Sequence, residues 1–140
     1  HWRTVMSSDP HRNATVFIVD DEAAIRDALS LVVRAMGISV HCFSSAHEFI
    51  EFLERHDVSS PACLITDIQM AKINGIVLLE QLIAMGWEFP VIMMTGHGDE
   101  TLRQKAEVLG ATYLEKPFRP SRLEEVIRAN LKHSNGEKDT

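Results

Sequence analysis

Three acidic residues that follow two apolar runs could together bind a divalent cation. Asp20 and Asp21 come directly after the run 16–19, and Asp67 comes directly after the run 62–66. If these runs are neighbouring strands, the three carboxylates lie within several ångströms of one another. Two like charges ~5 Å apart repel by about 3 kcal/mol at an effective dielectric constant of ~20, so such a cluster must hold a proton or a cation. Carboxylate oxygens suit Mg²⁺, or Mn²⁺ in its place.

A threonine and a lysine at the ends of two further runs could act on the same site. The hydroxyl of Thr95 could donate to a phosphoryl oxygen, and the ammonium of Lys116 could clamp one. A carboxylate nucleophile, a cation and fixed donors are what phosphoryl transfer to a protein requires, and Asp67 is the natural nucleophile. Each signal also has an ordinary alternative. Asp20, Asp21 or Thr95 can cap a helix or turn, and a lone lysine is usually solvated.

Short apolar runs alternate along the chain with amphipathic segments, which indicates strands alternating with helices. This order implies right-handed crossovers and a parallel sheet, with ligands bound at the carboxyl ends of the strands. We therefore expect an α/β protein with a single (βα)5 doubly wound parallel sheet and helices on both faces. The expected strands are 16–19, 38–43, 62–66, 91–94 and 112–115, and the expected helices are about 25–36, 45–53, 76–85, 100–109 and 121–131.

Capping residues predict where individual helices begin and end. The pairs Ser45-x-x-Glu48 and Ser121-x-x-Glu124 are capping boxes, each of which predicts the start of a helix. Gly37 is expected to end the first helix, because glycine readily adopts the left-handed conformation that terminates helices.

Composition and charge limit the possible functions. The chain has 140 residues, enough for one domain with a substantial core. Its formal net charge is −6 and it has no run of Lys or Arg, so direct nucleic-acid binding is not expected. No apolar stretch approaches the ~20 residues of a membrane-spanning helix, and no signal peptide is recognised. Cys42 and Cys63 lie in apolar segments without a CxxC pair, which favours buried, reduced thiols in a cytoplasmic protein.

Polar segments flank the expected domain at both ends. We expect a disordered extension or an expression remnant over 1–14, the folded domain over 15–132, and a flexible tail over 133–140. No internal repeat interrupts the folded part, so a single domain is expected.

Four motifs, in this order and spacing, resemble those of response regulator receiver domains. They are Val-Asp20-Asp21-Glu, Ile-Thr-Asp67-Ile-Gln-Met, Thr95-Gly-His-Gly and Glu-Lys116-Pro-Phe. Each motif is weak alone, but the set is highly specific and covers the chain from about residue 15 to residue 131. The resemblance implies strand order 2-1-3-4-5, as in flavodoxin-like folds. It also implies a phosphoacceptor switch of a two-component His-Asp phosphorelay, phosphorylated on Asp67 in a Mg²⁺-dependent reaction.

The resemblance further implies a role for each matching residue. The residue matching Asp21 binds Mg²⁺ directly, and the one matching Asp20 acts through water. Asp67 and the backbone carbonyl of Gln69 would complete the metal site. Lys116 matches an invariant lysine whose bond to the following proline is typically cis.

A switch pair and two tuning positions also follow from the resemblance. Thr95 matches the switch hydroxyl and Tyr113 the switch aromatic, although Tyr113 could be an ordinary half-buried strand residue. The side chains of Gln69 and His97 would tune the lifetime of the phosphorylated state, or they could be solvated loop residues.

The implied partners are a sensor histidine kinase or a phosphotransfer protein, and an effector domain or protein. Phosphorylation would change the surface formed by the fourth helix, the fifth strand and the last helix, and would thereby control transcription. The same surface could support a phosphorylation-dependent homodimer. The domain would catalyse only its own phosphorylation and dephosphorylation. It could be an isolated receiver or a piece of a longer regulator.

The sequence departs from the usual receiver pattern in three places. Ala71 stands where proline is usual, the stretch 110–113 is one residue short, and the helix after Gly98 is polar. Two rival hypotheses therefore stay open. A metal-dependent phosphatase would commonly carry an acidic residue two positions after its nucleophile, where Gln69 stands here. A pseudo-receiver would use the fold only to bind partners.

Overall fold

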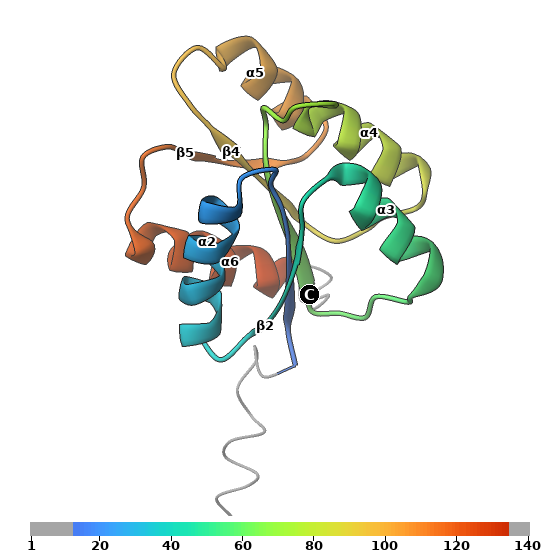
Figure 1. The fold of residues 1–140 in the computed structure, drawn as a ribbon, viewed down its shortest axis with the longest axis vertical. Helices are drawn as coiled ribbons and strands as arrows, with labels where there is room; N and C mark the ends of the chain where they lie inside the picture. The colour runs from blue at the N-terminus through green and yellow to red at the C-terminus, as the bar shows by residue number, and fades with distance from the viewer. Residues whose placement is uncertain (1–12, 135–140) are drawn as a thin grey trace, which may run out of the picture.

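The computed structural model describes residues 13–134, and most of the expected extension and tail lie outside this range. The elements within it alternate between strands and helices (Figure 1). Ala14, at the beginning of the described range, is buried, and its carbonyl accepts a hydrogen bond from the Ser39 amide. The elements are β1 Thr15–Val19, α2 Ala23–Ala35, β2 Ser39–Phe43, α3 Ala46–Arg55, β3 Ala62–Asp67, α4 Gly75–Ala84, β4 Val91–Thr95, α5 Glu100–Val108, β5 Thr112–Glu115 and α6 Pro120–Ser134.

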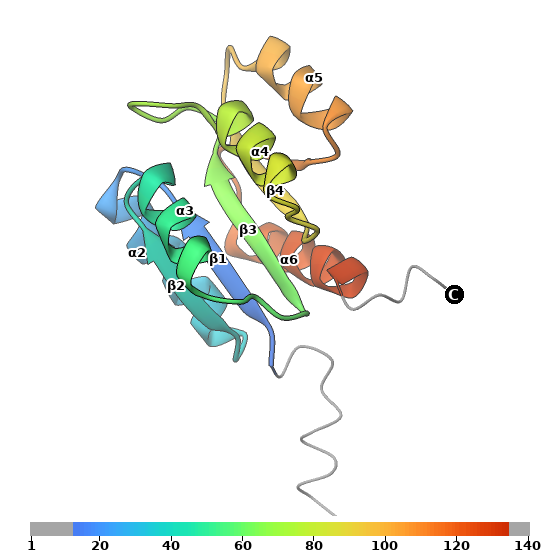
Figure 2. The same cartoon turned by 90° about the vertical axis from the view of Figure 1, so that its right-hand side faces the viewer.

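The five strands form one parallel sheet in the order β2-β1-β3-β4-β5, which confirms the expected topology. Helices α2 and α6 cover one face, and α3, α4 and α5 cover the other (Figures 1 and 2). All the strands run toward the same edge, so the residues that end or follow them share that edge. None of the helices in residues 13–134 is long and apolar enough to cross a bilayer.

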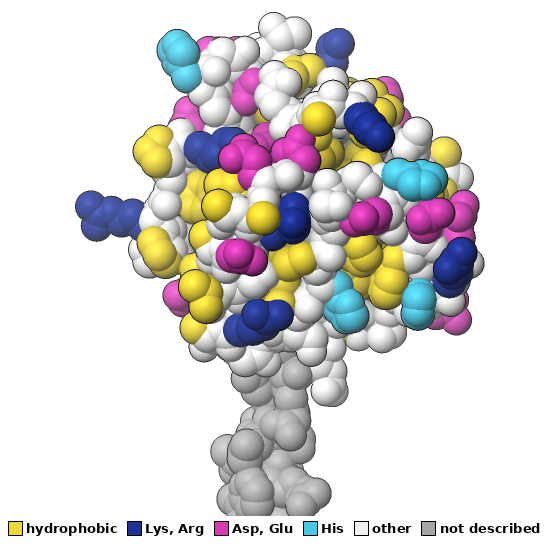
Figure 3. Space-filling view, viewed as in Figure 1, with side chains coloured by type: hydrophobic (Ala, Val, Ile, Leu, Met, Phe, Trp, Pro, Cys, Tyr) yellow, Lys and Arg dark blue, Asp and Glu magenta, His cyan; other side chains and the backbone are white. Residues whose placement is uncertain are grey.

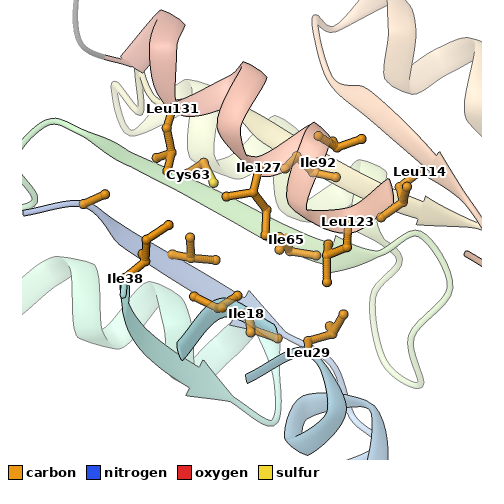
Figure 4. Packing of buried hydrophobic residues seen from close by; sticks show 14 of the residues in the cluster. Ile18, Leu29, Ile38, Cys63, Ile65, Ile92, Leu114, Leu123, Ile127 and Leu131 are labelled. Carbon is orange, nitrogen blue, oxygen red and sulfur yellow. The ribbon is translucent and has the colours of Figure 1, made fainter. Parts of the chain in front are cut away.

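Alternating side chains of the central strands build two separate cores. Ile18 of β1 and Ile65 of β3 pack against α2 and α6 on one face (Figure 4). Phe17 and Leu64, their neighbours in sequence, point to the opposite face and pack against α3 and α4. Because β1 and β3 are covered on both faces, they form the rigid centre of the sheet.

Only one of the two cysteines is buried as expected. Cys63 on the central strand β3 is fully buried, and burial raises the pKa of its thiol to about 12. The prediction that Cys42 is buried is wrong, because β2 lies at the edge of the sheet and exposes this side chain. Both thiols are free.

Ser45 caps α3 as predicted, although its reciprocal bond from Glu48 goes to the preceding residue, and the second predicted capping box is displaced. The Ser45 hydroxyl accepts from the Glu48 amide at 3.1 Å, and the Glu48 carboxylate accepts from the Ser44 amide at 2.8 Å. Helix α6 begins at Pro120, so Ser121 lies inside its first turn and does not cap it. Proline suits the first helical position because its fixed φ is helical and its missing N–H would be unpaired there.

Close packing of the α4 start against β3 fixes the end of the central strand. The Gly75 amide donates to the Ile68 carbonyl at 2.9 Å. A Cβ atom on Gly75 would lie 2.8 Å from the Asp67 backbone oxygen and 3.1 Å from the Ile68 Cα. Only glycine therefore allows this approach, and the contact holds the backbone of Asp67 in place.

We predict that Gly75→Ala destabilises the fold by about 1–3 kcal/mol, because the added methyl meets backbone atoms that cannot move aside cheaply. Urea unfolding would measure the loss. Gly96→Ala is the size-matched control, since its Cβ would meet nothing closer than 3.7 Å. Equal stability of the two variants would contradict the packing argument.

Candidate functional site

Polar residues from four strands meet at the carboxyl edge of the sheet. Asp20 follows β1, Lys116 follows β5, and Asp67 and Thr95 are the last residues of β3 and β4. Strand β1 pairs directly with β3, and the Lys116 amide donates to the Thr95 carbonyl at 2.7 Å. The sheet thus brings these residues to one edge, as expected from the sequence.

Asp67 is held by donors on both carboxylate oxygens. Its side chain is almost completely buried; Oδ2 accepts from the Lys116 ammonium at 2.9 Å and Oδ1 from the Gln69 amide at 2.9 Å. Two fixed donors give the carboxylate one orientation, which a nucleophile needs for in-line attack.

Lys116 is partly exposed, and its ammonium faces several carboxylates. Partial burial lowers the pKa of its amine, but the hydrogen bond and the negative charge of Asp67 outweigh that effect. The charges of Asp20 and Asp99 act in the same direction, so the pKa of Lys116 is raised overall. The side chain is therefore a cation at neutral pH. The bond from Lys116 to Pro117 is cis, as the resemblance implies.

Asp20 carries a buried carboxylate with one oxygen unpaired. Oδ1 accepts from the Glu22 amide at 2.9 Å, whereas Oδ2 is buried and lacks a hydrogen-bond partner within residues 13–134. Burial raises the pKa of the Asp20 carboxyl, and the negative charges of Asp67 and Asp21 add to the rise. The Glu22 amide lowers the pKa only in part. An unpaired buried carboxylate oxygen beside other carboxylates fits a divalent cation.

Asp21 lies next to Asp20 but is exposed. Its Oδ2 accepts from the Ala71 amide at 2.9 Å. Proline, the usual residue at position 71, has no such donor, so this departure ties the loop after β3 to Asp21. Carboxylate oxygens of Asp20, Asp21 and Glu22 lie within 4.8 Å of one another, and Glu22 is a possible ligand that the sequence reasoning missed. Figure 3 shows acidic side chains grouped near the start of α2.

The helix-cap alternative for the acidic pair is not supported. Glu22 occupies the N-cap position of α2, and no side chain caps that end. The carboxylates of Asp20 and Asp21 instead bond to the Glu22 and Ala71 amides.

Tyr113, the proposed switch aromatic, is half-buried on β5, where it pairs with Met93. The Arg103 guanidinium of α5 lies 4.8 Å from the centre of its ring. The pairing of β5 with β4 shows that the shortened stretch before Tyr113 leaves the strand register regular. Thr95 is buried at the end of β4, on the same edge as Asp67.

The two predicted tuning residues have different surroundings. His97 is exposed, whereas the Gln69 side chain donates to Asp99 Oδ1 at 3.0 Å. Sequence reasoning missed Asp99, which is buried and whose Oδ2 accepts from the Gly96 amide at 2.6 Å. Its place directly before a helix resembles an ordinary cap, so only the folded loop reveals these contacts.

Comparison with known proteins gives a consistent result. Residues 16–128 match the family described as response regulator receiver domain. The response regulator protein TodT of Pseudomonas putida is 41% identical over 122 residues, covering 86% of this chain and 52% of TodT. The transcriptional regulatory protein FixJ of Bradyrhizobium diazoefficiens is 36% identical over 120 residues, covering 85% of this chain and 57% of FixJ. The chain thus spans about half the length of these curated relatives.

Solved structures agree with the sequence matches. Full-length FixJ from B. japonicum has a TM-score of 0.79 and 35% identity, covering 86% of this chain and 58% of that one. The response regulator StyR has a TM-score of 0.78 and 33% identity, with 91% of this chain and 63% of that one covered.

We predict that Asp20→Asn raises the free energy of unfolding by about 1 kcal/mol at neutral pH without divalent cations. The folded state holds the Asp20 proton more tightly than the unfolded chain, whose pKa is near the ordinary 3.8. The stability of the wild type therefore falls as pH rises from the ordinary pKa to the raised pKa of Asp20. The Asp20→Asn variant, which carries no charge there, does not lose this stability. The gain should shrink as pH falls through the raised pKa. Urea unfolding at several pH values would measure it.

Asp57→Asn is the control, because it removes an exposed carboxylate outside the acidic cluster and should change stability by less than about 0.5 kcal/mol. With Mg²⁺ added, only proteins that retain Asp20 should gain stability. A less stable Asp20→Asn in cation-free buffer would show that the buried charge is already compensated.

Proposed function

The chain belongs to the response regulator receiver domains of two-component systems, and from this premise we propose that it is a phosphoacceptor switch with Asp67 as the phosphorylated residue. One observation carries the proposal: the Asp67 carboxylate is oriented by Lys116 and lies beside Asp20, which has an unpaired buried oxygen. The phosphoryl donor would be a sensor histidine kinase or a phosphotransfer protein.

In the proposed reaction, an Asp67 oxygen attacks the phosphorus atom of the donor. An O–P bond forms, the bond from phosphorus to the donor breaks, and the donor leaves with its electron pair. The Lys116 ammonium would move from the carboxylate to a phosphoryl oxygen and neutralise charge there. A bound Mg²⁺ or Mn²⁺ would neutralise further charge, held by Asp20, Asp21, Asp67 and the backbone carbonyl of Gln69.

The domain would catalyse only its own phosphorylation and the later hydrolysis of the acyl phosphate. Gln69 and His97 lie on the loops after β3 and β4, and their side chains would tune the lifetime of the phosphorylated state. The phosphatase alternative is weaker, because position 69 holds an amide that cannot act as a general acid. The pseudo-receiver alternative is weaker because Asp20, Asp67 and Lys116 are all in place.

The output would arise at the surface formed by α5, β5 and α6. The Thr95 hydroxyl would donate to the phosphoryl group, and the Tyr113 ring would move inward and leave Arg103. The changed surface would control an effector domain or protein, or form a homodimer. The relatives TodT and FixJ are described as a response regulator and a transcriptional regulatory protein, which supports an output in transcription. We propose a cytoplasmic location, where both free thiols would stay reduced.

We predict that acetyl phosphate with Mg²⁺ adds one phosphoryl group to the protein, as measured by intact mass spectrometry. Asp67→Asn should abolish the addition, because an amide oxygen is too weak a nucleophile. Asp57→Asn, at an exposed position after α3, is the matched control and should be labelled like the wild type. Chelation of Mg²⁺ should prevent labelling. Undiminished labelling of Asp67→Asn would refute the assignment of the acceptor.

We predict that the ring of Tyr113 changes environment when beryllofluoride and Mg²⁺ mimic the acyl phosphate. Tyr113 is the single tyrosine of the chain, so fluorotyrosine incorporation gives one fluorine NMR signal that reports this ring alone. The signal should shift on addition of beryllofluoride with Mg²⁺, because the ring leaves the guanidinium of Arg103.

Thr95→Val, which keeps the side-chain shape but removes the hydroxyl, should bind the mimic and show a much smaller shift. A wild-type signal that stays in place while amide signals near Asp67 shift would exclude Tyr113 from the switch.

A further inference from the structure

Asp99 occupies a helix-capping position without capping the helix. It is the N-cap residue of α5, but its side chain makes no hydrogen bond to the first turn. Oδ2 instead accepts from the Gly96 amide at 2.6 Å, and Oδ1 accepts from the Gln69 side-chain amide at 3.0 Å. An aspartate at this position normally stabilises its helix. The orientation of the Asp99 side chain toward the neighbouring loops therefore needs another explanation.

Both groups that Asp99 holds belong to the loops that surround the phosphorylation site. Gly96 follows Thr95, and a Cβ atom on it would lie 3.9 Å from Lys116 Cε. Gln69 is two residues beyond Asp67, whose Oδ1 accepts from its backbone amide. The Gly96 N–H is thus a donor at the edge where a phosphoryl group on Asp67 would need donors, and a carboxylate already holds it.

The charge of Asp99 acts on the same site. The negative charges of Asp67, Asp20 and Asp99 all attract the ammonium of Lys116. A phosphoryl dianion on Asp67 would compete with Asp99 for the Gly96 N–H and for this ammonium, and the two anions would repel each other.

We propose that Asp99 is a positioning residue that occupies the phosphoryl-binding amide of Gly96 in the unphosphorylated chain and must leave it on phosphorylation. The inference rests on the proposed function of Asp67. Departure of the Asp99 carboxylate would also release the Gln69 side chain. The loops after β3 and β4 would therefore separate in the same step.

The release of Asp99 has a direct path to the output surface. The Asp99 carbonyl accepts from the Arg103 amide at 2.8 Å, and the Arg103 guanidinium lies over the Tyr113 ring. Arg103 Nε is buried and has no partner within residues 13–134. Ala106 is the one buried residue of α5, so few contacts resist a shift of this helix. Movement of Asp99 would therefore displace the first turn of α5 and loosen the Arg103–Tyr113 contact.

The test is a titration of the full chain with beryllofluoride in the presence of Mg²⁺, followed by amide chemical shifts. Asp99→Asn lacks the charge and keeps one acceptor oxygen in place of two, and it should bind the mimic about tenfold more tightly than the wild type. Asp99→Ala should tighten binding at least as much. Glu100→Gln, which removes an adjacent exposed charge, is the control and should bind within about twofold of the wild type.

A second readout separates competition from a merely structural role. The Gly96 amide proton should lie downfield in the unliganded wild type, because it donates to a carboxylate, and should move upfield in Asp99→Ala. Addition of beryllofluoride should then bring the Gly96 signals of the wild type and of Asp99→Ala together, since both would donate to the same ligand.

The outcomes distinguish the two proposals. A wild type that does not bind beryllofluoride would overturn the proposed function and this inference with it. A wild type that binds, with folded Asp99 variants that bind equally or more weakly, would overturn the inference alone. Urea unfolding of each variant shows whether the protein is folded under the titration conditions. If Asp99→Ala does not fold, the affinity of Asp99→Asn alone decides the test.

Discussion

An excess of negative charge at one buried edge of the sheet is the constraint on which the site depends. A parallel sheet sends the ends of all its strands to the same edge, so Asp20 and Asp67 become neighbours although 46 residues separate them in sequence. One ammonium, that of Lys116, faces both carboxylates and bonds only to Asp67. The remaining oxygen of Asp20 is buried without a partner among the described residues 13–134. Protonation or a cation can relieve this excess.

The rest of the fold keeps these charges from moving apart. Strands β1 and β3 are covered on both faces by apolar side chains, so the Asp20 and Asp67 backbones adjoin the closely packed centre of the molecule. The close approach of Gly75 to Asp67 adds a contact that no larger residue permits. By contrast, α5 buries little apolar surface. A closely packed sheet centre beside a lightly packed α5 suits the proposed switch, because a local charge change could then displace a distant surface.

Site residues that end or directly follow a strand could be predicted from the sequence. Asp20, Asp67, Thr95 and Lys116 each follow or end an apolar run, and the motif resemblance supplied the strand order that brings them together. Features that depend on loop conformation or on position within the sheet could not be found this way. Cys42 has an apolar neighbourhood in sequence, but β2 is an edge strand and exposes it. Asp99 looks like a helix cap, and its bonds to Gly96 and Gln69 exist only because two loops from different strands meet.

Several polar groups of the site are partnered by one another in this state. Lys116 holds Asp67, the Ala71 amide holds Asp21, and the Gly96 amide holds Asp99. A buried polar group that loses its partner carries a free-energy cost, so these internal pairs stabilise the folded chain. Each pair contains one group that a cation or a phosphoryl dianion could engage instead. In the proposed function, a bound cation or phosphoryl group would therefore replace some of these internal partners.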